Sequence, residues 1–204
     1  MHGVAHAELS LSRTILILLL VIGVSVTFSS SAMAQQKPLP AAEQPVKSEK
    51  NPPGDIPDNQ VFIDYASPLG FSVKVPEGWA RQDLLDGVSF ADKYGRISMS
   101  QTAAPKMLSV EEAKQTLVPE LEKSSRAVTV AAVKPVKLPA GPAIRVSYGS
   151  NSDPNPVTNK AIRLESDRYY FWKDGKLVSV NFSAPAGADN ADQWEMMARS
   201  FRWR

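Results

Sequence analysis

Hydrophobic and polar residues alternate with a period of two along several segments of this chain, most clearly over 71–75. There, Phe71, Val73 and Val75 are separated by polar residues. Because successive side chains of a β-strand point to opposite faces, this pattern predicts a strand with one buried face. Similar alternation or β-branched content predicts further strands at 61–65, 88–90, 97–99, 128–136, 144–148, 161–172 and 177–182.

Two other segments have the period of a helix. The first begins with Ser109 and Glu112, a spacing that favours a capping box, and Pro119 should kink or split this helix. The second follows Asp189 or Asn190, either of which is a preferred N-cap residue. Its apolar stripe should lie against a sheet. The stripe consists of Trp194, Met197, Ala198 and Phe201.

The order of these elements indicates the fold class. Asp174 and Gly175 favour a type I′ turn between two of the strands, which predicts a hairpin. Strands, a helix, four strands and a final helix then follow one another. The sequence therefore predicts an α+β domain over 61–204, in which an antiparallel meander is sandwiched by helices.

The first 34 residues predict the compartment. Arg13 precedes an apolar run at 15–22, which is short for a membrane span. Ala32 and Ala34 then provide the small residues that a signal peptidase requires. We expect residues 1–34 to be a signal peptide that is cleaved after Ala34, which makes the protein periplasmic or secreted. An uncleaved N-terminal anchor is the alternative.

Residues 35–60 differ from the rest of the chain in composition. They are rich in proline and polar residues and carry only scattered aliphatic side chains. Such a segment buries too little apolar surface to offset its ordering entropy. We therefore expect a disordered or extended linker, with a partner-docking arm as the alternative.

Composition excludes several kinds of chemistry. The chain has no Cys, and its two histidines, His2 and His6, lie in the predicted signal peptide. The mature chain therefore lacks Ser-His-Asp and Cys-His machinery and the usual zinc, copper and haem ligands. Asp83, Asp86 and Asp92 lack the spacing of a calcium loop, so we expect no metal and no cofactor. A net charge of +2 with interspersed signs indicates no nucleic-acid binding.

One segment resembles a known family. The sequence at 70–79, GFSVKVPEGW, is similar to the opening of the PsbP-like superfamily, which includes PsbP of photosystem II, the Mog nuclear-transport factor and exported bacterial proteins. The hairpin at 172–177 and the helix at 194–201 also resemble the layout of that superfamily. The resemblance implies a PsbP-like α/β/α sandwich and a non-catalytic binding or assembly role.

Four successive aromatic residues allow two interpretations. Tyr170 and Trp172 should face one way along the strand, whereas Tyr169 and Phe171 face the other. In the first interpretation, each pair packs under one helix layer. In the second, Tyr169 and Phe171 form an exposed patch, which makes them candidate partner-binding residues.

We therefore expect an exported, non-catalytic binding or assembly module of the cell envelope. Its partner would be an unknown protein, and the chain would be a monomer that is at most peripheral to the membrane. One alternative is a lumenal protein like the extrinsic subunits of photosystem II. The other is a carboxylate-based hydrolase, which a buried carboxylate pair in a cleft would favour. Asp83 and Asp86 are the nearest such pair in the sequence.

Overall fold

A computed structural model describes residues 43–204, and the predicted signal peptide with its cleavage site lies outside this range. Neither helix in the described part is long and apolar enough to cross a membrane. The strands are β1 (Phe62–Ser67), β2 (Phe71–Pro76), β3 (Ala80–Leu84), β4 (Gly87–Ala91), β5 (Arg96–Ala103), β6 (Arg126–Leu138), β7 (Gly141–Asn151), β8 (Arg163–Lys173), β9 (Lys176–Pro185) and β10 (Arg202–Trp203). The helices are α1 (Val110–Ser124) and α2 (Ala191–Ser200).

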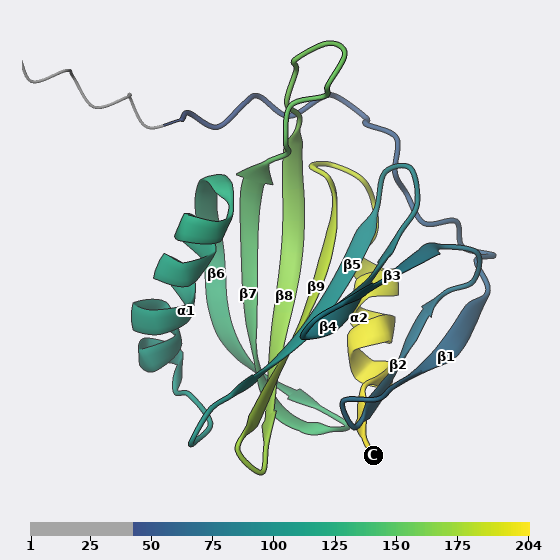
Figure 1. Ribbon diagram of the computed structural model, residues 1–204. Coiled ribbons are helices and arrows are strands. Elements are labelled where there is room, and N and C mark those ends of the chain that lie inside the picture. The colour runs from purple at the N-terminus through teal and green to yellow at the C-terminus, as the bar shows by residue number, and fades with distance from the viewer. Residues whose placement is uncertain (1–42) are drawn as a thin grey trace, which may run out of the picture. The chain divides into compact units, whose positions relative to one another are not determined.

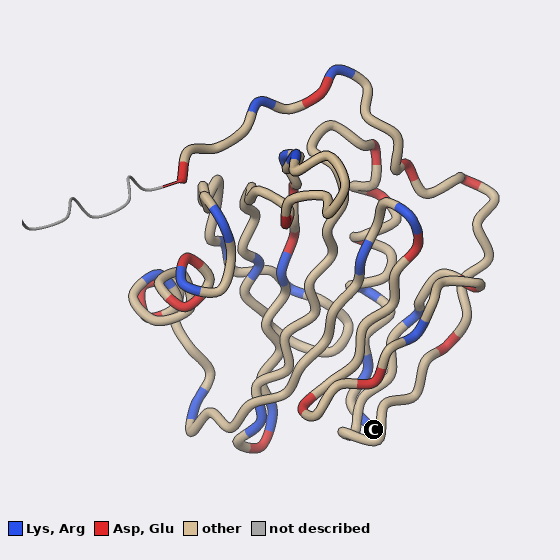
Figure 2. Tube along the Cα trace, turned by 45° about the horizontal axis from the view of Figure 1, so that its top comes forward, with Lys and Arg blue, Asp and Glu red and all other residues tan. Residues whose placement is uncertain are grey.

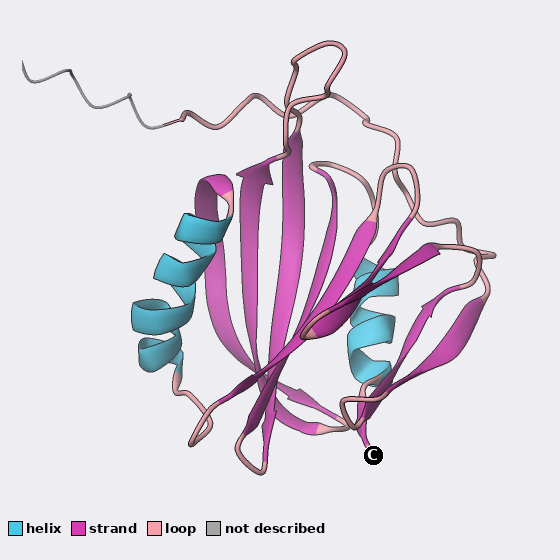
Figure 3. Ribbon diagram, viewed as in Figure 1, coloured by secondary structure: helices cyan, strands magenta, loops and turns pink. Residues whose placement is uncertain are grey.

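The strands form two antiparallel sheets (Figures 1 and 3). The large sheet has seven strands in the order β3-β4-β5-β9-β8-β7-β6, and the small sheet has the order β1-β2-β10. The predicted Asp174–Gly175 turn joins β8 to β9, and both residues have the positive φ angles of a type I′ turn, +48° and +78°. The order of elements and the α+β class agree with the prediction from the sequence.

The large sheet separates two hydrophobic cores. On one face, Ile144, Val146 and Tyr170 pack with α1. On the other face, Tyr169 and Phe171 pack with α2 and with the small sheet. The two helices therefore cover opposite faces of the sheet (Figure 1), as the predicted sandwich requires.

The aromatic run of β8 belongs to these cores. Tyr169 and Phe171 are only 3% and 1% exposed, so they do not form the surface patch that the second interpretation required. Phe171 stacks on Phe201 with ring centroids 4.0 Å apart, and burial raises the pKa of Tyr169 to about 12. The reason is that α2 lies over this face of β8. Both side chains therefore fill the core instead of a docking surface.

The capping box of α1 is confirmed. The Ser109 hydroxyl accepts a hydrogen bond from the backbone N–H of Glu112, and the Glu112 carboxylate accepts one from the N–H of Ser109. Of the predicted kink or split at Pro119, the split does not occur, since α1 continues through this residue. Proline removes the hydrogen bond to the carbonyl of residue 115, and Gln115 is exposed, so water can replace the missing donor.

Two strands were not predicted from the sequence. Every residue of β3 is exposed, and this edge strand has no alternating pattern to reveal it. The strand β10 has only two residues, and it is recognisable only through its pairing with β2. β3 depends on a short hairpin with β4 and β10 on a contact with a distant segment, and periodicity reports neither.

The described part of the predicted linker, residues 43–60, forms no helix or strand but is bound to the domain. Asn190, which is buried, accepts a hydrogen bond from the N–H of Ile56 at 2.6 Å and donates one to the carbonyl of Gly54 at 3.0 Å. At its other end, Glu43 pairs with Arg126 at 2.8 Å. The sequence predicted a disordered or extended segment, and hydrogen bonds from Val46 and Ile56 to buried side chains of the domain favour the extended form for these residues.

Replacing Phe171 with alanine should lower the free energy of unfolding by about 3–5 kcal/mol, as large-to-small changes in a core do. Chemical denaturation of the purified protein measures this change. Leu85→Ala is the matched control, because Leu85 is fully exposed and its loss should change stability little. A Phe171 variant as stable as the wild type would contradict the core assignment.

Replacing Asn190 with alanine should lower the free energy of unfolding by about 1–3 kcal/mol, since it leaves the buried N–H of Ile56 without an acceptor. Hydrogen exchange should then show faster exchange at Ile56 in the variant. Asn59→Ala, at an exposed position of the same segment, should leave both measurements unchanged. Unaltered exchange at Ile56 would show that Asn190 does not hold the segment.

Candidate functional site

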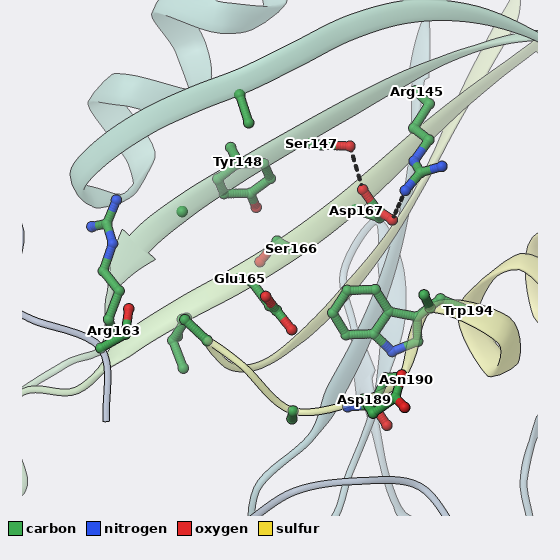
Figure 4. A pocket seen from close by; sticks show the side chains of 17 residues that line it. Arg145, Ser147, Tyr148, Arg163, Glu165, Ser166, Asp167, Asp189, Asn190 and Trp194 are labelled. Carbon is green, nitrogen blue, oxygen red and sulfur yellow. Dashed lines mark hydrogen bonds and ion pairs between the residues drawn. The ribbon is translucent and has the colours of Figure 1, made fainter. Parts of the chain in front are cut away.

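A polar cavity of about 390 Å³ opens on the α2 face of the large sheet (Figure 4). It forms where β7 and β8 extend beyond the N-terminus of α2, so that this helix no longer covers them. Ser48, from the N-terminal segment, also lines it. The charged and polar side chains that line the cavity include Arg145, Ser147, Arg163, Glu165, Asp167, Asp189 and Trp194.

Asp167 is the most buried carboxylate of this cavity, with 6% of the residue exposed. It accepts a hydrogen bond from Arg145 Nη2 at 2.5 Å and another from the Ser147 hydroxyl at 2.5 Å. On β7, Ser147 is directly opposite Asp167, and Arg145 is opposite Tyr169, with its guanidinium 5.8 Å from the centroid of that ring. Asp167 and Arg145 therefore neutralise each other within the wall of the cavity.

Glu165 has a different environment from Asp167. Burial raises the pKa of Glu165 above its ordinary value, and the carboxylates of Asp167 and Asp189 raise it further. A hydrogen bond from the backbone N–H of Gly187 acts in the opposite direction. No Lys or Arg of the described residues forms an ion pair with Glu165 or Asp189. These two carboxylates make this end of the cavity electronegative.

Trp194 forms the aromatic part of the wall. It is 6% exposed and stacks on Phe182, with centroids 6.2 Å apart. No residue within 43–204 accepts a hydrogen bond from its Nε1–H, and this atom is not among the buried polar atoms that lack a partner, so it is open to the cavity. Figure 4 looks onto the indole ring, with Glu165, Asp189 and Asn190 drawn in the same part of the cavity.

Arg163 closes the other end of the cavity (Figure 4). Its Nη1 donates to the carbonyl of Ala127 at 2.7 Å and to Oδ1 of Asn151 at 3.1 Å. Gly149 makes room for it, since a Cβ there would lie 2.7 Å from Nη2 of Arg163. Burial lowers the pKa of Arg163, but its hydrogen bonds hold the guanidinium against the protein.

The candidate site residues predicted from the sequence do not line the cavity. Tyr169 and Phe171 are in the core, as described above. Asp83 pairs with Arg81 at 2.7 Å on the exposed strand β3, and Asp86 lies in the adjoining turn. Neither aspartate lines the polar cavity.

Sequence reasoning missed the cavity residues, although a signal was present. Arg163, Glu165 and Asp167 alternate with a period of two in a segment that was predicted to be a strand. Such a pattern places three charges on one face of that strand. The same face continues into Tyr169 and Phe171, so its change from charged to aromatic marks where α2 begins to cover the sheet.

The chemical groups present limit what the cavity can do. Among residues 43–204, no three His, Cys, Asp or Glu side chains are close enough together to hold a metal ion. The Ser147 hydroxyl donates to Asp167, and residues 43–204 contain no histidine that could act as its base. The cavity offers hydrogen-bond donors, carboxylates and an aromatic wall. Such groups are typical of binding sites for small polar molecules.

No protein-family model and no curated protein sequence matches this chain. Solved structures do match it. The cyanobacterial PsbP protein (CyanoP) of Synechocystis sp. PCC 6803 is 14% identical, with a TM-score of 0.52 over 74% of this chain and 98% of that chain. The Ran-binding protein Mog1p of Saccharomyces cerevisiae is 11% identical, with a TM-score of 0.51 over 71% and 96%. The chain therefore has the Mog1p/PsbP-like fold, as its resemblance implied.

The raised pKa of Glu165 predicts a dependence of stability on pH. The folded state holds this proton more tightly than the unfolded chain, so ionisation of Glu165 costs stability as the pH rises above the ordinary carboxyl range. Glu165→Gln removes this titration. Compared with the wild type, the variant should therefore gain stability as the pH rises from acid to neutral.

Urea denaturation at a series of pH values measures this difference. Glu120→Gln is the matched control, because Glu120 is exposed on α1 and pairs only with Lys123. A constant difference between Glu165→Gln and wild type across the series would show that the Glu165 carboxyl is not perturbed by its surroundings.

Proposed function

We propose that this chain is an exported, non-catalytic binding or assembly module of the cell envelope, and that the polar cavity is where it binds. One observation carries this proposal. The cavity is built on β7, β8 and α2, and hydrogen bonds from Arg145 and Ser147 fix its Asp167 from within the protein. A site that is organised by contacts within the protein loses little conformational entropy on binding.

The compartment rests on the N-terminal sequence. The predicted signal peptide supports export to the periplasm or beyond the cell, where a protein partner would be met. The N-terminal segment supports a role near the cavity, since Ser48 lines its mouth while Ile56 is anchored on Asn190. Mog1p, which shares the fold, is a Ran-binding protein, and this supports a binding use of such a scaffold.

A carboxylate-based hydrolase is the second candidate. Glu165 and Asp167 meet part of its requirement, because two carboxylates with different environments line one cavity. However, Asp167 accepts hydrogen bonds at both of its oxygens, which leaves it poorly placed to act as base or nucleophile. The fold does not favour the photosystem alternative, since CyanoP and Mog1p match it about equally well.

A photo-crosslinking amino acid placed at Ser48 or Ala186, both on the cavity wall, tests the binding role in cells that export the protein. We expect one envelope protein to be captured from both positions. The same residue at Glu120, on the exposed face of α1, should not capture it. Capture from all three positions alike, or from none of them, would contradict a partner at the cavity.

The hydrolase alternative has its own measurement. The purified protein should show no turnover with ester, glycoside and peptide substrates. Turnover that disappears in both Glu165→Gln and Asp167→Asn would overturn the non-catalytic proposal, because these changes remove the two carboxylates such chemistry needs.

A further inference from the structure

We propose that the cavity binds a protonated organic amine that carries a neighbouring carbonyl oxygen, with Glu165 and Asp189 holding the ammonium group and Trp194 donating to the oxygen. This inference rests on the proposed function, since it names the ligand class of the same cavity. It follows from the groups of the cavity that the protein itself leaves unpaired.

The charges of the cavity leave a negative excess near Trp194. Asp167 is neutralised by Arg145, and Arg163 is bound at the far end by Ala127 and Asn151. Glu165 and Asp189 have no cationic partner among the described residues. A cation placed between them would replace the mutual repulsion of the carboxylates with attraction.

The N-terminal segment does not supply this cation. Lys47 and Lys50 flank Ser48, which lines the cavity. Neither lysine forms an ion pair with Glu165 or Asp189 in the described part of the chain. The position is therefore available to a positively charged ligand from outside.

Trp194 gives the second, independent observation. The residue is 6% exposed and lines the cavity, and its Nε1–H has no acceptor within residues 43–204. Because Nε1 is not among the buried polar atoms that lack a partner, this N–H is open to the cavity, where a ligand oxygen can replace water as its acceptor. The indole ring also favours an ammonium group near its face through cation–π attraction. The carboxylates of Glu165 and Asp189 alone would favour any cation. The Trp194 N–H also favours a ligand that carries a hydrogen-bond acceptor.

The simplest molecule with both groups is an α-amino amide, in which an ammonium and a carbonyl oxygen are joined by one carbon. A cavity of about 390 Å³ accommodates a ligand of this size. Two sources supply this chemistry, a free amino-acid derivative and the N-terminus of a peptide, and the experiment below separates them.

The indole N–H resonance of Trp194 is a direct reporter of this binding. In the ¹⁵N-labelled exported protein it is one of four indole signals, and Trp194→Phe identifies it by its absence. Glycinamide is the probe, at about pH 6.5, where its α-amino group is protonated. We expect the Trp194 signal to shift with saturation, whereas N-acetylglycinamide, which has no charge, should leave it in place.

The variants test the two carboxylates. Glu165→Gln and Asp189→Asn should each weaken glycinamide binding about threefold to fivefold, the range for partly exposed ion pairs. Glu120→Gln is the matched control and should change nothing. An equal response to glycinamide and N-acetylglycinamide, or full affinity in both carboxylate variants, would overturn the proposal. Butylamine lacks the carbonyl and should bind more weakly, and equal affinity would overturn the assigned role of the Trp194 N–H.

The source of the amine is settled by Gly-Ser-Gly-amide. Tighter binding than glycinamide supports a peptide N-terminus, whereas weaker binding supports a free small amine. Failure of this inference is distinguishable from failure of the proposed function. Crosslinking at Ser48 and Ala186 to an envelope protein, without any amine binding, would leave the binding role intact and overturn only the ligand class.

Discussion

The constraint on which this structure depends is the alternation of side chains along β8. Tyr170 faces the core under α1, while Tyr169 and Phe171 face the core under α2. A single strand thus contributes to both hydrophobic cores, and β7 and β9 follow it in register. If the register of β8 slipped by one residue, its aromatic side chains would exchange faces and both cores would be lost.

The same alternation positions the cavity. Arg163, Glu165 and Asp167 lie on the α2 face of β8, continuous with Tyr169 and Phe171. The face is aromatic where it packs with α2 and charged where it lines the cavity. The cavity is therefore a consequence of the position of α2, and its charges follow from the strand that also forms the core.

Much of this arrangement could be predicted from local pattern. The alternation at 144–148, the turn at Asp174 and the apolar stripe of α2 each depend on neighbouring residues, so the sequence reports them directly. The association of distant segments could not be predicted in this way. Asn190 looked like a helix cap, yet its side chain makes no cap hydrogen bond and holds Ile56 and Gly54 instead. Figure 2 shows acidic and basic residues interspersed along the chain, so charge counting did not reveal the cavity either.

The charged wall of the cavity is difficult to explain by stability alone. An ion pair with one partner buried, such as Asp167 with the partly exposed Arg145, often contributes no more than well-packed apolar residues of similar volume would. Moreover, Arg145 Nε is buried without a hydrogen-bond partner, which costs free energy that the fold does not recover. The neighbouring strands show that apolar side chains fit this sheet well. Arg145, Asp167 and Glu165 line the cavity near the N-terminus of α2, so the proposed binding role would depend on them more than the fold does.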